Sequence, residues 1–260
     1  MTKKYTVITG ASTGIGRATA KAFAARQKNL ILVARREEAL MLVKEELLAE
    51  YPSLDIIVKS IDLSVPDECI KFFKSLEQFE LETWINNAGF GHYSTFRDQN
   101  VLRTQEMIRL NVEAVTILSL LFVQKYQDVS GTQLINVSSA GGYTIVPTAI
   151  TYCGTKFFVS AFTEGLAHEL KAANAPMQAK VLAPAATKTE FGKVANNDAT
   201  YDYDQAFGMY HTSEEMAEFL LALYDSEETV GYVSREHFRF ELTQPQFAYA
   251  NQAGVNQKNK

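Results

Sequence analysis

Cysteine is scarce in this sequence, and long apolar runs are absent. The 260 residues include two cysteines, Cys69 and Cys153, and their positions fit neither a C-x-x-C motif nor a metal-binding pattern. We therefore expect no disulfide framework, no metal ion and a reducing compartment, the cytoplasm. The apolar stretch around residues 115–123 is too short to span a bilayer, and residues 1–10 lead straight into a strand pattern without a signal-peptide core. These absences argue against a membrane protein and against a disulfide-rich secreted one.

Basic charge is also in short supply. The formal net charge is −5 and the isoelectric point is near 5.5, and Arg35-Arg36 is the only arginine doublet. A general nucleic-acid binder would present a basic stripe, so we expect no nucleic-acid partner. With 47% hydrophobic and 21% charged residues, the composition fits a single globular domain over residues 1–260.

Short apolar, β-branched runs alternate with amphipathic helical patterns along most of the chain. The alternation predicts strands near residues 6–9, 30–34, 55–61, 83–86, 133–137 and 178–182, and helices near residues 14–28, 37–51, 66–79, 101–128 and 151–174. Helix-length crossovers between apolar strands are typical of a parallel sheet that is covered on both faces. We therefore predict an α/β fold, a doubly wound parallel sheet of the Rossmann type with three layers, α/β/α.

Two segments interrupt this alternation. Residues 187–211 are polar and aromatic with weak periodicity, which is long for a loop in a compact domain and indicates a substrate lid. The aromatic rings of this segment would close over an apolar or aromatic substrate, or else pack on a partner subunit. Beyond residue 235 only the run FRFEL has a recognisable pattern, and residues 250–260 form a polar tail that we expect to be disordered.

A glycine-rich stretch, TGASTGIG at residues 9–16, follows the first predicted strand and opens the first predicted helix. Gly10, Gly14 and Gly16 stand where the chain must turn tightly, and without a Cβ they permit the close approach of a pyrophosphate. The helix N-terminus adds free N–H groups and the positive end of the helix dipole. A turn without a ligand could carry the same glycines, but the strand before it and the helix after it favour nucleotide binding.

Six motifs, in this order, resemble those of the short-chain dehydrogenase/reductase family in its single-domain subfamily. They are TGASTGIG (9–16), NNAG (86–89), Asn111, INVSS (135–139), YCGTK (152–156) and a segment centred on Pro184. The resemblance runs from residue 6 to about residue 217. It implies an enzyme that moves a hydride between a nicotinamide cofactor and a small carbonyl or alcohol substrate, working as a homodimer or homotetramer.

Tyr152 and Lys156 lie four residues apart at the start of a predicted helix, so both project from one face. An unperturbed tyrosine has a pKa near ~10, and a neighbouring ammonium would lower that pKa toward neutrality. The pair alone is expected by chance, but Ser139 at the end of an apolar strand adds weight to it. By the resemblance, Tyr152 exchanges a proton with the substrate oxygen, Ser139 hydrogen-bonds that oxygen, and Lys156 also binds the nicotinamide ribose. Ser138 is a rival for the serine role, with a spacing to Tyr152 that is one residue too long.

The resemblance also assigns roles that the residues alone do not require. Asn111 would hold a water that links Lys156 to solvent, although it could simply be a polar residue on a helix face. Asn87 would lie along the cofactor and Asp62 would meet the adenine, although the first could belong to a structural turn and the second could cap a helix. Together with Tyr152 and Lys156, the implied cofactor contacts are Gly10, Ser12, Thr13, Gly14, Ile15, Gly16, Arg35, Asp62, Leu63, Asn87, Ala88, Gly89, Pro184, Thr187 and Thr189.

The end of the second predicted strand indicates the cofactor preference. An NAD-binding site places an acid there to bind the ribose 2′-hydroxyl, whereas an arginine accommodates the 2′-phosphate of NADP. Here the strand ends at Ala34 and is followed by Arg35 and Arg36. We therefore expect NADP(H) rather than NAD(H), with Arg35 the stronger candidate, although both arginines could simply begin a solvated helix.

The chain departs from the family's pattern after Pro184. Ala185 replaces the usual glycine, while Thr189 matches the threonine that contacts the carboxamide. A methyl group at position 185 is tolerated where the backbone is not left-handed. Two further residues, Cys153 and His92, are expected to be structural rather than catalytic.

Three functions are compatible with the resemblance: an oxidoreductase, a catalytically silent NADP-binding sensor or scaffold, and an epimerase or dehydratase of the longer relatives. The presence of Ser139, Tyr152, Lys156 and Asn111 together favours the first. The G-x-x-x-G-x-G spacing argues against the third. The sequence leaves the substrate and the direction of the reaction open.

Overall fold

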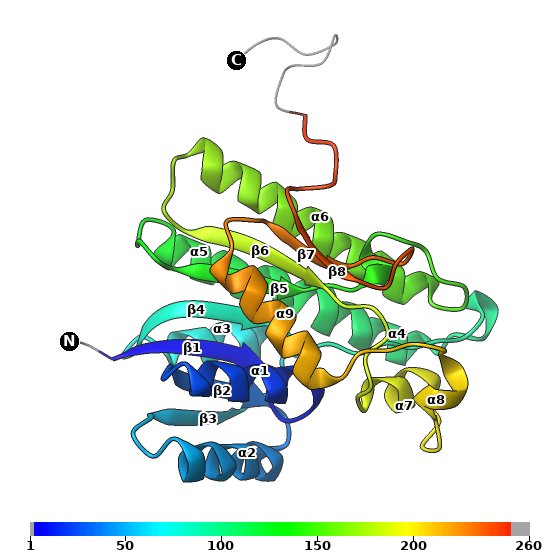
Figure 1. The fold of residues 1–260 in the computed structure, drawn as a ribbon, viewed down its shortest axis with the longest axis horizontal. Helices are drawn as coiled ribbons and strands as arrows, with labels where there is room; N and C mark the ends of the chain where they lie inside the picture. The colour runs from blue at the N-terminus through cyan, green and yellow to red at the C-terminus, as the bar shows by residue number, and fades with distance from the viewer. Residues whose placement is uncertain (1–2, 251–260) are drawn as a thin grey trace.

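The computed structural model describes residues 3–250, and this part of the chain forms one eight-stranded sheet with helices on both faces (Figure 1). The strand order is β3-β2-β1-β4-β5-β6-β7-β8, and neighbouring strands are parallel except for the antiparallel pair β7 and β8. This order confirms the predicted doubly wound α/β fold. Apart from Ala250, the tail expected at residues 250–260 lies outside the described residues. The strands are β1 (Lys4–Thr9), β2 (Asn29–Ala34), β3 (Ile56–Ser60), β4 (Glu80–Asn86), β5 (Gln133–Val137), β6 (Gln178–Ala183), β7 (Val230–Val233) and β8 (Phe240–Thr243).

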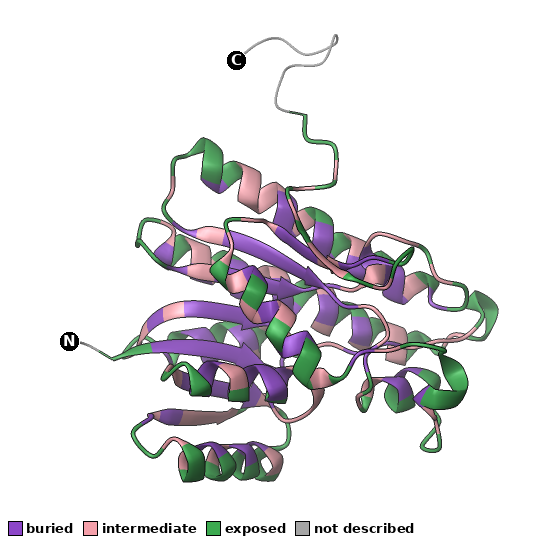
Figure 2. Ribbon diagram, in the orientation of Figure 1, coloured by how far each residue is buried: buried purple, intermediate pink, exposed green. Residues whose placement is uncertain are grey.

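Two apolar cores lie on opposite faces of the sheet. Successive strand residues point to opposite sides, so Ile8 joins one core and Val7 the other. The central strands are buried almost throughout, while the outer faces of the helices are exposed (Figure 2). Burial on both faces explains why these strands read as continuous apolar runs rather than as an alternating pattern. One face is covered by α1 (Gly14–Ala25), α2 (Glu37–Glu50) and α9 (Ser213–Asp225), and the other by α3 (Pro66–Lys74), α5 (Val115–Tyr126) and α6 (Ile150–Ala172).

The helix predicted over residues 101–128 is divided into three consecutive pieces. These are α4 (Val101–Ile108), a π-helical segment η2 (Arg109–Ala114), and α5. A π-helical turn inserts an extra residue into the helical repeat and is frequent at functional sites. Asn111 lies within η2 and is buried, so the interruption occurs at one of the predicted site residues.

The helix α9 and the strands β7 and β8 were not predicted from the sequence. A signal for α9 was present, because Thr212 and Glu215 form a capping box in which each side chain accepts a hydrogen bond from the other residue's backbone N–H. Four buried apolar residues then follow at helical spacing: Met216, Ala217, Leu220 and Leu223. The strand β7 has four residues, which is too short for a periodic pattern to stand out, and β8 overlaps the run FRFEL, whose pattern was seen but not assigned to a strand.

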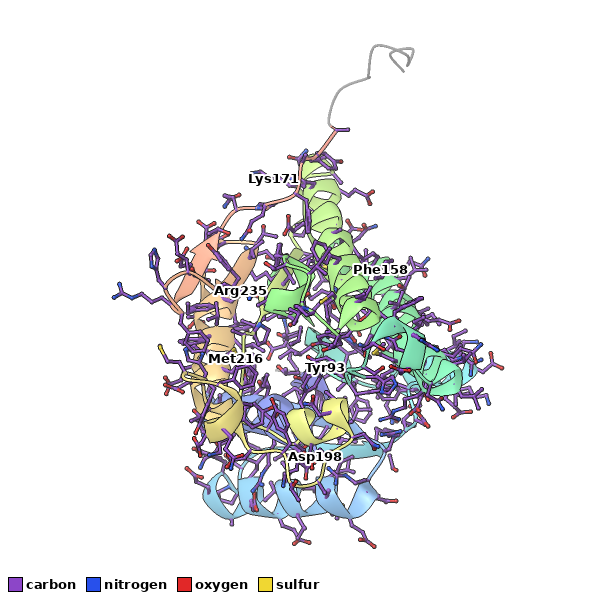
Figure 3. The ribbon with its side chains drawn as sticks, turned by 90° about the vertical axis from the view of Figure 1, so that its right-hand side faces the viewer. Tyr93, Phe158, Lys171, Asp198, Met216 and Arg235 are labelled. Atoms are coloured by element: carbon purple, nitrogen blue, oxygen red, sulfur yellow. The ribbon has the colours of Figure 1, made fainter. Side chains whose placement is uncertain are left out.

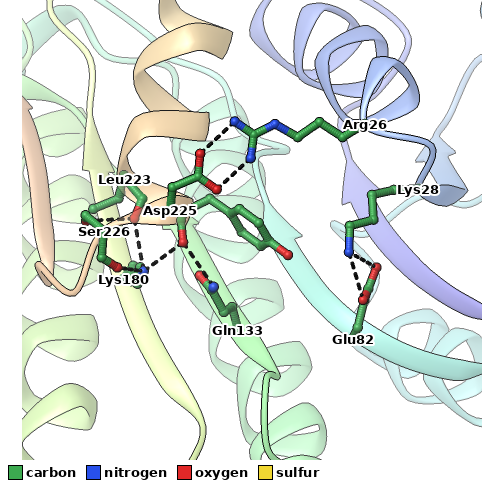
Figure 4. A network of polar contacts seen from close by, with 9 residues as sticks. Arg26, Lys28, Glu82, Gln133, Lys180, Leu223, Asp225 and Ser226 are labelled. Carbon is green, nitrogen blue, oxygen red and sulfur yellow. Dashed lines mark hydrogen bonds and ion pairs between the residues drawn. The ribbon is translucent and has the colours of Figure 1, made fainter.

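Polar contacts fasten the C-terminal end of α9 to the sheet (Figure 4). Lys180 in β6 is buried and donates hydrogen bonds from Nζ to the carbonyl oxygens of Leu223 and Tyr224. Arg26, just after α1, forms two 2.6 Å hydrogen bonds with the carboxylate of Asp225. Because the last carbonyls of a helix lack partners within it, the Lys180 ammonium is well placed to bind them. Burial lowers the pKa of Lys180 to about 8.

Among residues 3–250, no helix is both long and apolar enough to cross a membrane. The same part of the chain holds no group of three or more His, Cys, Asp or Glu side chains placed to bind a metal ion.

Candidate active site

A cavity of about 830 Å³ opens at the carboxyl edge of the sheet, where the strand order reverses between β1 and β4. In doubly wound sheets, ligands bind outside the carboxyl ends of the strands at such a reversal. Of the predicted site residues, only Gly16 and Asn111 lie outside the lining. The lining therefore includes Gly10, Ser12, Thr13, Gly14, Ile15, Arg35, Asp62, Leu63, Asn87, Ala88, Gly89, Ser139, Tyr152, Lys156, Pro184, Thr187 and Thr189.

The glycine-rich loop between β1 and α1 requires its glycines. Gly10 and Gly14 have φ angles of +67° and +56°, which L side chains rarely adopt. A Cβ at Gly16 would lie 2.2 Å from the carbonyl oxygen of Gly10, so this residue allows the loop to close on the helix. The Thr13 side chain makes no capping hydrogen bond to α1, and the first turn of the helix lines the cavity. Such a helix N-terminus is suited to bind a pyrophosphate.

The NNAG turn after β4 is fastened to this loop through Asn87. Its amide nitrogen donates to the carbonyl oxygens of Thr9 (2.9 Å) and Gly10 (3.3 Å). The Thr9 hydroxyl in turn accepts hydrogen bonds from the backbone N–H groups of Asn87 and Ala88, at 3.0 Å each. Asn87 therefore has a structural role in joining two cavity walls, whether or not it also contacts a cofactor.

Tyr152 and Lys156 lie on the first turns of α6 and are almost fully buried, with 6% and 5% of their surfaces exposed. The Lys156 Nζ lies 5.8 Å from the centre of the Tyr152 ring and donates a 2.9 Å hydrogen bond to the carbonyl oxygen of Val137. Because both side chains line the cavity, the four-residue spacing brings the phenol and the ammonium to one site. Ser139, Tyr152 and Lys156 are referred to below as the catalytic end of the cavity.

The expectation of a lowered tyrosine pKa was wrong for this structure. Burial raises the pKa of Tyr152, although a hydrogen bond with the Ser139 hydroxyl acts in the opposite direction. Burial also lowers the pKa of Lys156 to about 8. The Lys156 ammonium faces the Val137 carbonyl, and desolvation disfavours the charged form of both groups. Tyr152 is therefore a neutral phenol that carries its proton, the form in which it can act as an acid.

The two serines after β5 have different surroundings. The Ser138 hydroxyl is buried, donates a 2.9 Å hydrogen bond to the carbonyl oxygen of Lys156, and lies 2.7 Å from the Ser160 hydroxyl. The Ser139 hydroxyl accepts a 3.0 Å hydrogen bond from the N–H of Gly141. A methyl group built on Gly141 would lie 3.4 Å from the Ser139 oxygen and 3.7 Å from the Tyr152 ring. Ser138 thus joins β5 to α6, while Ser139 stands beside the tyrosine.

Asn111 is buried behind the residues that line this site. Its side-chain oxygen accepts a hydrogen bond from the N–H of Phe90, and its nitrogen donates to the carbonyl oxygen of Phe90 and to the Thr155 hydroxyl. A methyl group on Gly89 would lie 2.9 Å from the Asn111 oxygen and 3.5 Å from the Lys156 Nζ. Asn111 and Lys156 therefore meet at the NNAG turn, and the water-holding role of Asn111 stays a prediction.

Two arginines mark the opposite end of the cavity, called here the arginine end. The side chains of Arg35 and Arg36 are 57% and 58% exposed. Arg35 forms an ion pair with Glu106 (3.3 Å) and Arg36 one with Glu190 (3.0 Å). Both arginines line the cavity, so the stronger candidacy of Arg35 also stays a prediction.

The Asp62 carboxylate lies next to the arginine end. It accepts hydrogen bonds from the backbone N–H (3.0 Å) and the hydroxyl (2.7 Å) of Ser64. Partial burial acts to raise the pKa of Asp62, but the bonds from Ser64 and the charge of Arg35 outweigh it, so the pKa is lowered. Asp62 is therefore a charged side chain in a turn, and it is available at the cavity wall.

The loop after β6 lies against the glycine-rich loop. The carbonyl oxygen of Pro184 accepts a 2.7 Å hydrogen bond from the N–H of Ala140, which links the ends of β5 and β6. Ala185 does not have a positive φ, so alanine fits where the family usually has glycine. The methyl group of Thr189 would lie 3.1 Å from a Cβ built on Gly14. This loop therefore borders the cavity next to Gly14.

The segment at residues 187–211 forms two short helices, α7 (Phe191–Asn196) and α8 (Tyr203–Ala206), rather than an irregular loop. Its ends meet, because Thr187 pairs with His211. Figure 3 shows these helices beside Tyr93, with Arg235 on the side of β7 and β8. Four of the five aromatic residues in residues 190–211 line the cavity: Phe191, Tyr201, Tyr203 and Phe207.

Tyr93, Arg235 and Phe238 also line the cavity and were missed by the sequence analysis. The Tyr93 ring lies 5.6 Å from that of Tyr152, and the Phe191 ring of α7 lies 5.4 Å from it. Arg235 and Phe238, from the turn between β7 and β8, also line the cavity. No local motif marks Tyr93 or Arg235, whereas Phe191 belonged to the segment predicted as a lid and Phe238 begins the run FRFEL.

Two side chains that the sequence analysis set aside do not line the cavity. The Cys153 sulfur is buried and accepts a 3.3 Å hydrogen bond from the N–H of Val146. The His92 ring accepts a 3.4 Å hydrogen bond from the N–H of Asn100. Both contacts agree with structural roles.

Comparisons with known proteins agree with this architecture. The family model described as short chain dehydrogenase matches residues 4–200. Dehydrogenase/reductase SDR family member 11 of Gallus gallus is 31% identical over 214 residues, covering 77% of this chain and 84% of that protein. A short-chain dehydrogenase from Sphingobium yanoikuyae, solved in complex with NADPH, is 27% identical with a TM-score of 0.80, covering 88% of this chain and 87% of that one. A bulky-bulky ketone specific alcohol dehydrogenase from Comamonas testosteroni is 27% identical with a TM-score of 0.76, covering 88% and 85%.

Proposed function

Because this chain belongs to the short-chain dehydrogenase family, we propose that it is an NADP(H)-dependent oxidoreductase acting on carbonyl or alcohol groups, with Tyr152 as the proton donor or acceptor. One observation carries the proposal. A buried Tyr152, a buried Lys156 and the Ser139 hydroxyl meet in a cavity whose wall also includes a glycine-rich phosphate loop. A hydride-transfer enzyme needs this combination of a nucleotide site and a proton donor.

The residues at the cavity fit a nicotinamide dinucleotide. A Cβ at Gly10 would lie 2.8 Å from the Asn87 amide nitrogen, so only glycine lets the loop pack against the NNAG turn, and a loop of this kind suits the close approach of a pyrophosphate. The first turn of α1 would hold the pyrophosphate, Asp62 and Leu63 the adenine, and Thr187 and Thr189 the carboxamide side. When bound, such a cofactor supplies or accepts the hydride.

In the direction of carbonyl reduction, the side chains of the catalytic end supply the proton. Burial keeps the phenol of Tyr152 protonated, so its hydroxyl can donate the proton to the substrate oxygen. The Ser139 hydroxyl would hydrogen-bond that same oxygen as negative charge develops on it. The Lys156 ammonium, when charged, would stabilise the phenolate that remains on Tyr152.

The arginine end supports NADP(H) over NAD(H). At the end of β2 the chain has Ala34 in place of an acid that would bind a ribose 2′-hydroxyl, and Arg35 follows at the cavity wall. A guanidinium is suited to a 2′-phosphate because its N–H groups match the phosphate oxygens. The NADPH complex of the relative from Sphingobium yanoikuyae supports the same preference.

The lid supports a bulky, apolar or aromatic carbonyl compound as the substrate. The rings of Phe191, Tyr203 and Phe207 line the cavity together with Tyr93. Apolar and aromatic walls with a few polar groups are typical of small-molecule sites. The relative from Comamonas testosteroni, named for bulky-bulky ketones, points to the same substrate class.

The proposal also covers assembly and location. We propose a homodimer or homotetramer in the cytoplasm, as the family resemblance implies. Large apolar side chains on the surface, including Phe96, Leu102 and Ile145, are 69% to 76% exposed, and such groups are commonly buried between subunits. Light scattering coupled to size exclusion would give a single monomer mass if this part of the proposal is wrong.

The function is tested by following NADPH and NADH consumption against a panel of aldehydes and ketones of graded size. We expect turnover of at least one bulky ketone, faster with NADPH than with NADH. NADPH binding without turnover of any compound would instead point to the silent sensor or scaffold. NADH preference would overturn the assignment of the arginine end while leaving the reaction class intact.

A further inference from the structure

Glu164 is a buried carboxylate that the proposed reaction does not use. It lies on α6 with 1% of its surface exposed. Among the described residues no lysine, arginine or histidine forms an ion pair with it. Its carboxyl oxygens accept three hydrogen bonds instead: from the Tyr143 hydroxyl at 2.6 Å, and from the backbone N–H groups of Gln246 (2.7 Å) and Phe247 (2.8 Å). Because burying a polar group is costly unless it is hydrogen-bonded, these three bonds indicate that the surrounding fold provides a specific binding site for the Glu164 side chain.

A row of polar contacts runs along α6 from the catalytic end to Glu164. It consists of Ser138, Ser160, Tyr143 and Glu164 and is called here the polar seam. Residues 156, 160 and 164 lie four apart and therefore on one face of α6. Along this face the Lys156 carbonyl accepts from the Ser138 hydroxyl, the Ser160 hydroxyl contacts the same Ser138 hydroxyl, and Glu164 accepts from Tyr143. The turn that carries Ser139 is thus fastened to the helix that carries Tyr152 and Lys156.

The turn itself has no room to shift toward α6. A Cβ on Gly142 would lie 2.3 Å from the Ser138 oxygen and 2.7 Å from the carbonyl oxygen of Lys156. Gly142 donates its N–H to the Ser139 carbonyl at 2.7 Å, and Tyr143 follows directly. The position of the Tyr143 hydroxyl therefore fixes the end of the same turn that begins with Ser139.

The segment after β8, residues 244–249, covers the Glu164 end of the polar seam. It passes along α6 in Figure 1. The Phe247 ring stacks on Tyr143 at 5.3 Å, and the Tyr249 ring stacks on His168 at 4.2 Å. Residues 244–249 therefore form a strap, and the strap binds Glu164 through the backbone N–H groups of the two residues that follow Pro245.

We propose that Glu164 is a positioning residue of the active site and that the strap, residues 244–249, completes it. Together they hold Tyr143, and through it the Ser139 turn, against α6, which sets the geometry between Ser139 and Tyr152. The inference rests on the proposed function, because it concerns the geometry of that same proton-donating site. Small displacements of reacting groups slow a reaction strongly even when the substitution is remote.

The test compares Glu164→Gln and Tyr143→Phe with the wild type and with Lys180→Met. Lys180 is buried and bonded to the end of α9, so its replacement is a control for lost stability away from the site. The measurements are kcat, the Kd for NADPH, the melting temperature, and the primary isotope effect on kcat with NADPH deuterated at the transferred position. We expect both seam variants to lose about 10- to 100-fold in kcat and to show a larger isotope effect, with the Kd for NADPH within about 2-fold.

Two further results distinguish positioning from stability. The double variant Glu164→Gln/Tyr143→Phe should be no slower than the slower single variant, because both substitutions act on the same contact, the hydrogen bond between Tyr143 and Glu164. Lys180→Met should lower the melting temperature without changing kcat or the isotope effect. If Glu164→Gln does not fold, Tyr143→Phe and Phe247→Ala carry the test, since the first removes one hydroxyl and the second one ring.

Seam variants with a lower melting temperature but an unchanged kcat and isotope effect would overturn the inference. An unchanged kcat in Phe247→Ala alone would remove the stacking of the Phe247 ring on Tyr143 from the inference, because the backbone bonds of the strap to Glu164 persist in that variant. A wild-type protein that consumes no NADPH with any carbonyl compound would overturn the proposed function, and this inference with it.

Discussion

Tyr152 and Lys156 at the catalytic end of the cavity are 6% and 5% exposed, whereas the side chains of Arg35 and Arg36 at the arginine end are more than half exposed. In the buried pair, desolvation decides the protonation state, so it raises the pKa of the phenol and lowers that of the ammonium. The exposed arginines are paired with carboxylates, and surface ion pairs contribute little. We therefore expect the removal of one atom, such as the Tyr152 hydroxyl oxygen, to change activity strongly at the catalytic end. At the arginine end we expect the positive charge to affect cofactor binding more than its exact position does.

The largest expected effect is at the phenol of Tyr152. Tyr152→Phe removes the transferable proton and keeps the ring, so kcat should fall by at least ~10²-fold while the Kd for NADPH is nearly unchanged. Tyr126→Phe is the matched control, because Tyr126 is equally buried but lies outside the cavity. Steady-state kinetics and a fluorescence titration of NADPH measure the two quantities. A fully active Tyr152→Phe enzyme would assign the proton to another group.

A second prediction concerns the pH dependence at Lys156. Its pKa is lowered to about 8 by burial, so the ammonium is present below pH 8 and is lost as the pH rises above it. If the charged form is required, kcat/KM for NADPH should fall about tenfold per pH unit above that pKa, as a single titration dictates. Lys156→Arg, which keeps its charge, should be slower at pH 7 but flat between pH 7 and 9. A wild-type profile without a break in this range would contradict the requirement.

Substitutions at the arginine end should have a smaller effect than those at Tyr152 and Lys156. Arg35→Ala should weaken NADPH binding by about 1–2 kcal/mol, toward the low side for hydrogen bonds to charged groups because the guanidinium is exposed. NADH binding should be almost unchanged, since NADH has no 2′-phosphate. Arg17→Ala is the control, because Arg17 is similarly exposed and ion-paired but does not line the cavity. Equal losses for both cofactors would show that Arg35 does not distinguish them.

The smallest effect is expected in the lid. Phe207 lines the cavity and is partly exposed, so Phe207→Ala should raise the KM for bulky ketones by roughly 5-fold or less, the equivalent of about 1 kcal/mol of apolar contact. The KM for small ketones should hardly change, because they would not reach the ring. Leu42→Ala serves as the control, as Leu42 is an exposed apolar residue of α2 outside the cavity. Equal changes for large and small ketones would argue against a lid that contacts substrate.

The sequence predicted the elements that carry strong local signals. The strands β1 to β6 and the helices α1, α2, α3 and α6 lie within a few residues of their predicted positions, because their apolar periodicity is long enough to be read. By contrast, β7 is too short to show a period, the FRFEL pattern at β8 was not assigned to a strand, and α9 was missed although Thr212 and Glu215 mark its start. The break at η2 was also missed, since nothing in residues 101–128 interrupts the helical pattern.

The difference between local and distant contacts explains what could be read at the site. The glycine-rich loop, the NNAG turn and the Tyr152–Lys156 pair act within a few residues, so their backbone angles and shared helix face follow from spacing alone. The tyrosine pKa was predicted in the wrong direction, because burial on every side depends on the whole fold. Glu164 and Gln246 are hydrogen-bonded although 82 positions separate them in the sequence. Lys180 and Leu223 of α9 are hydrogen-bonded across 43 positions. Only the tertiary structure decides such contacts, since they form when the sheet has brought distant segments together and desolvated the charges between them.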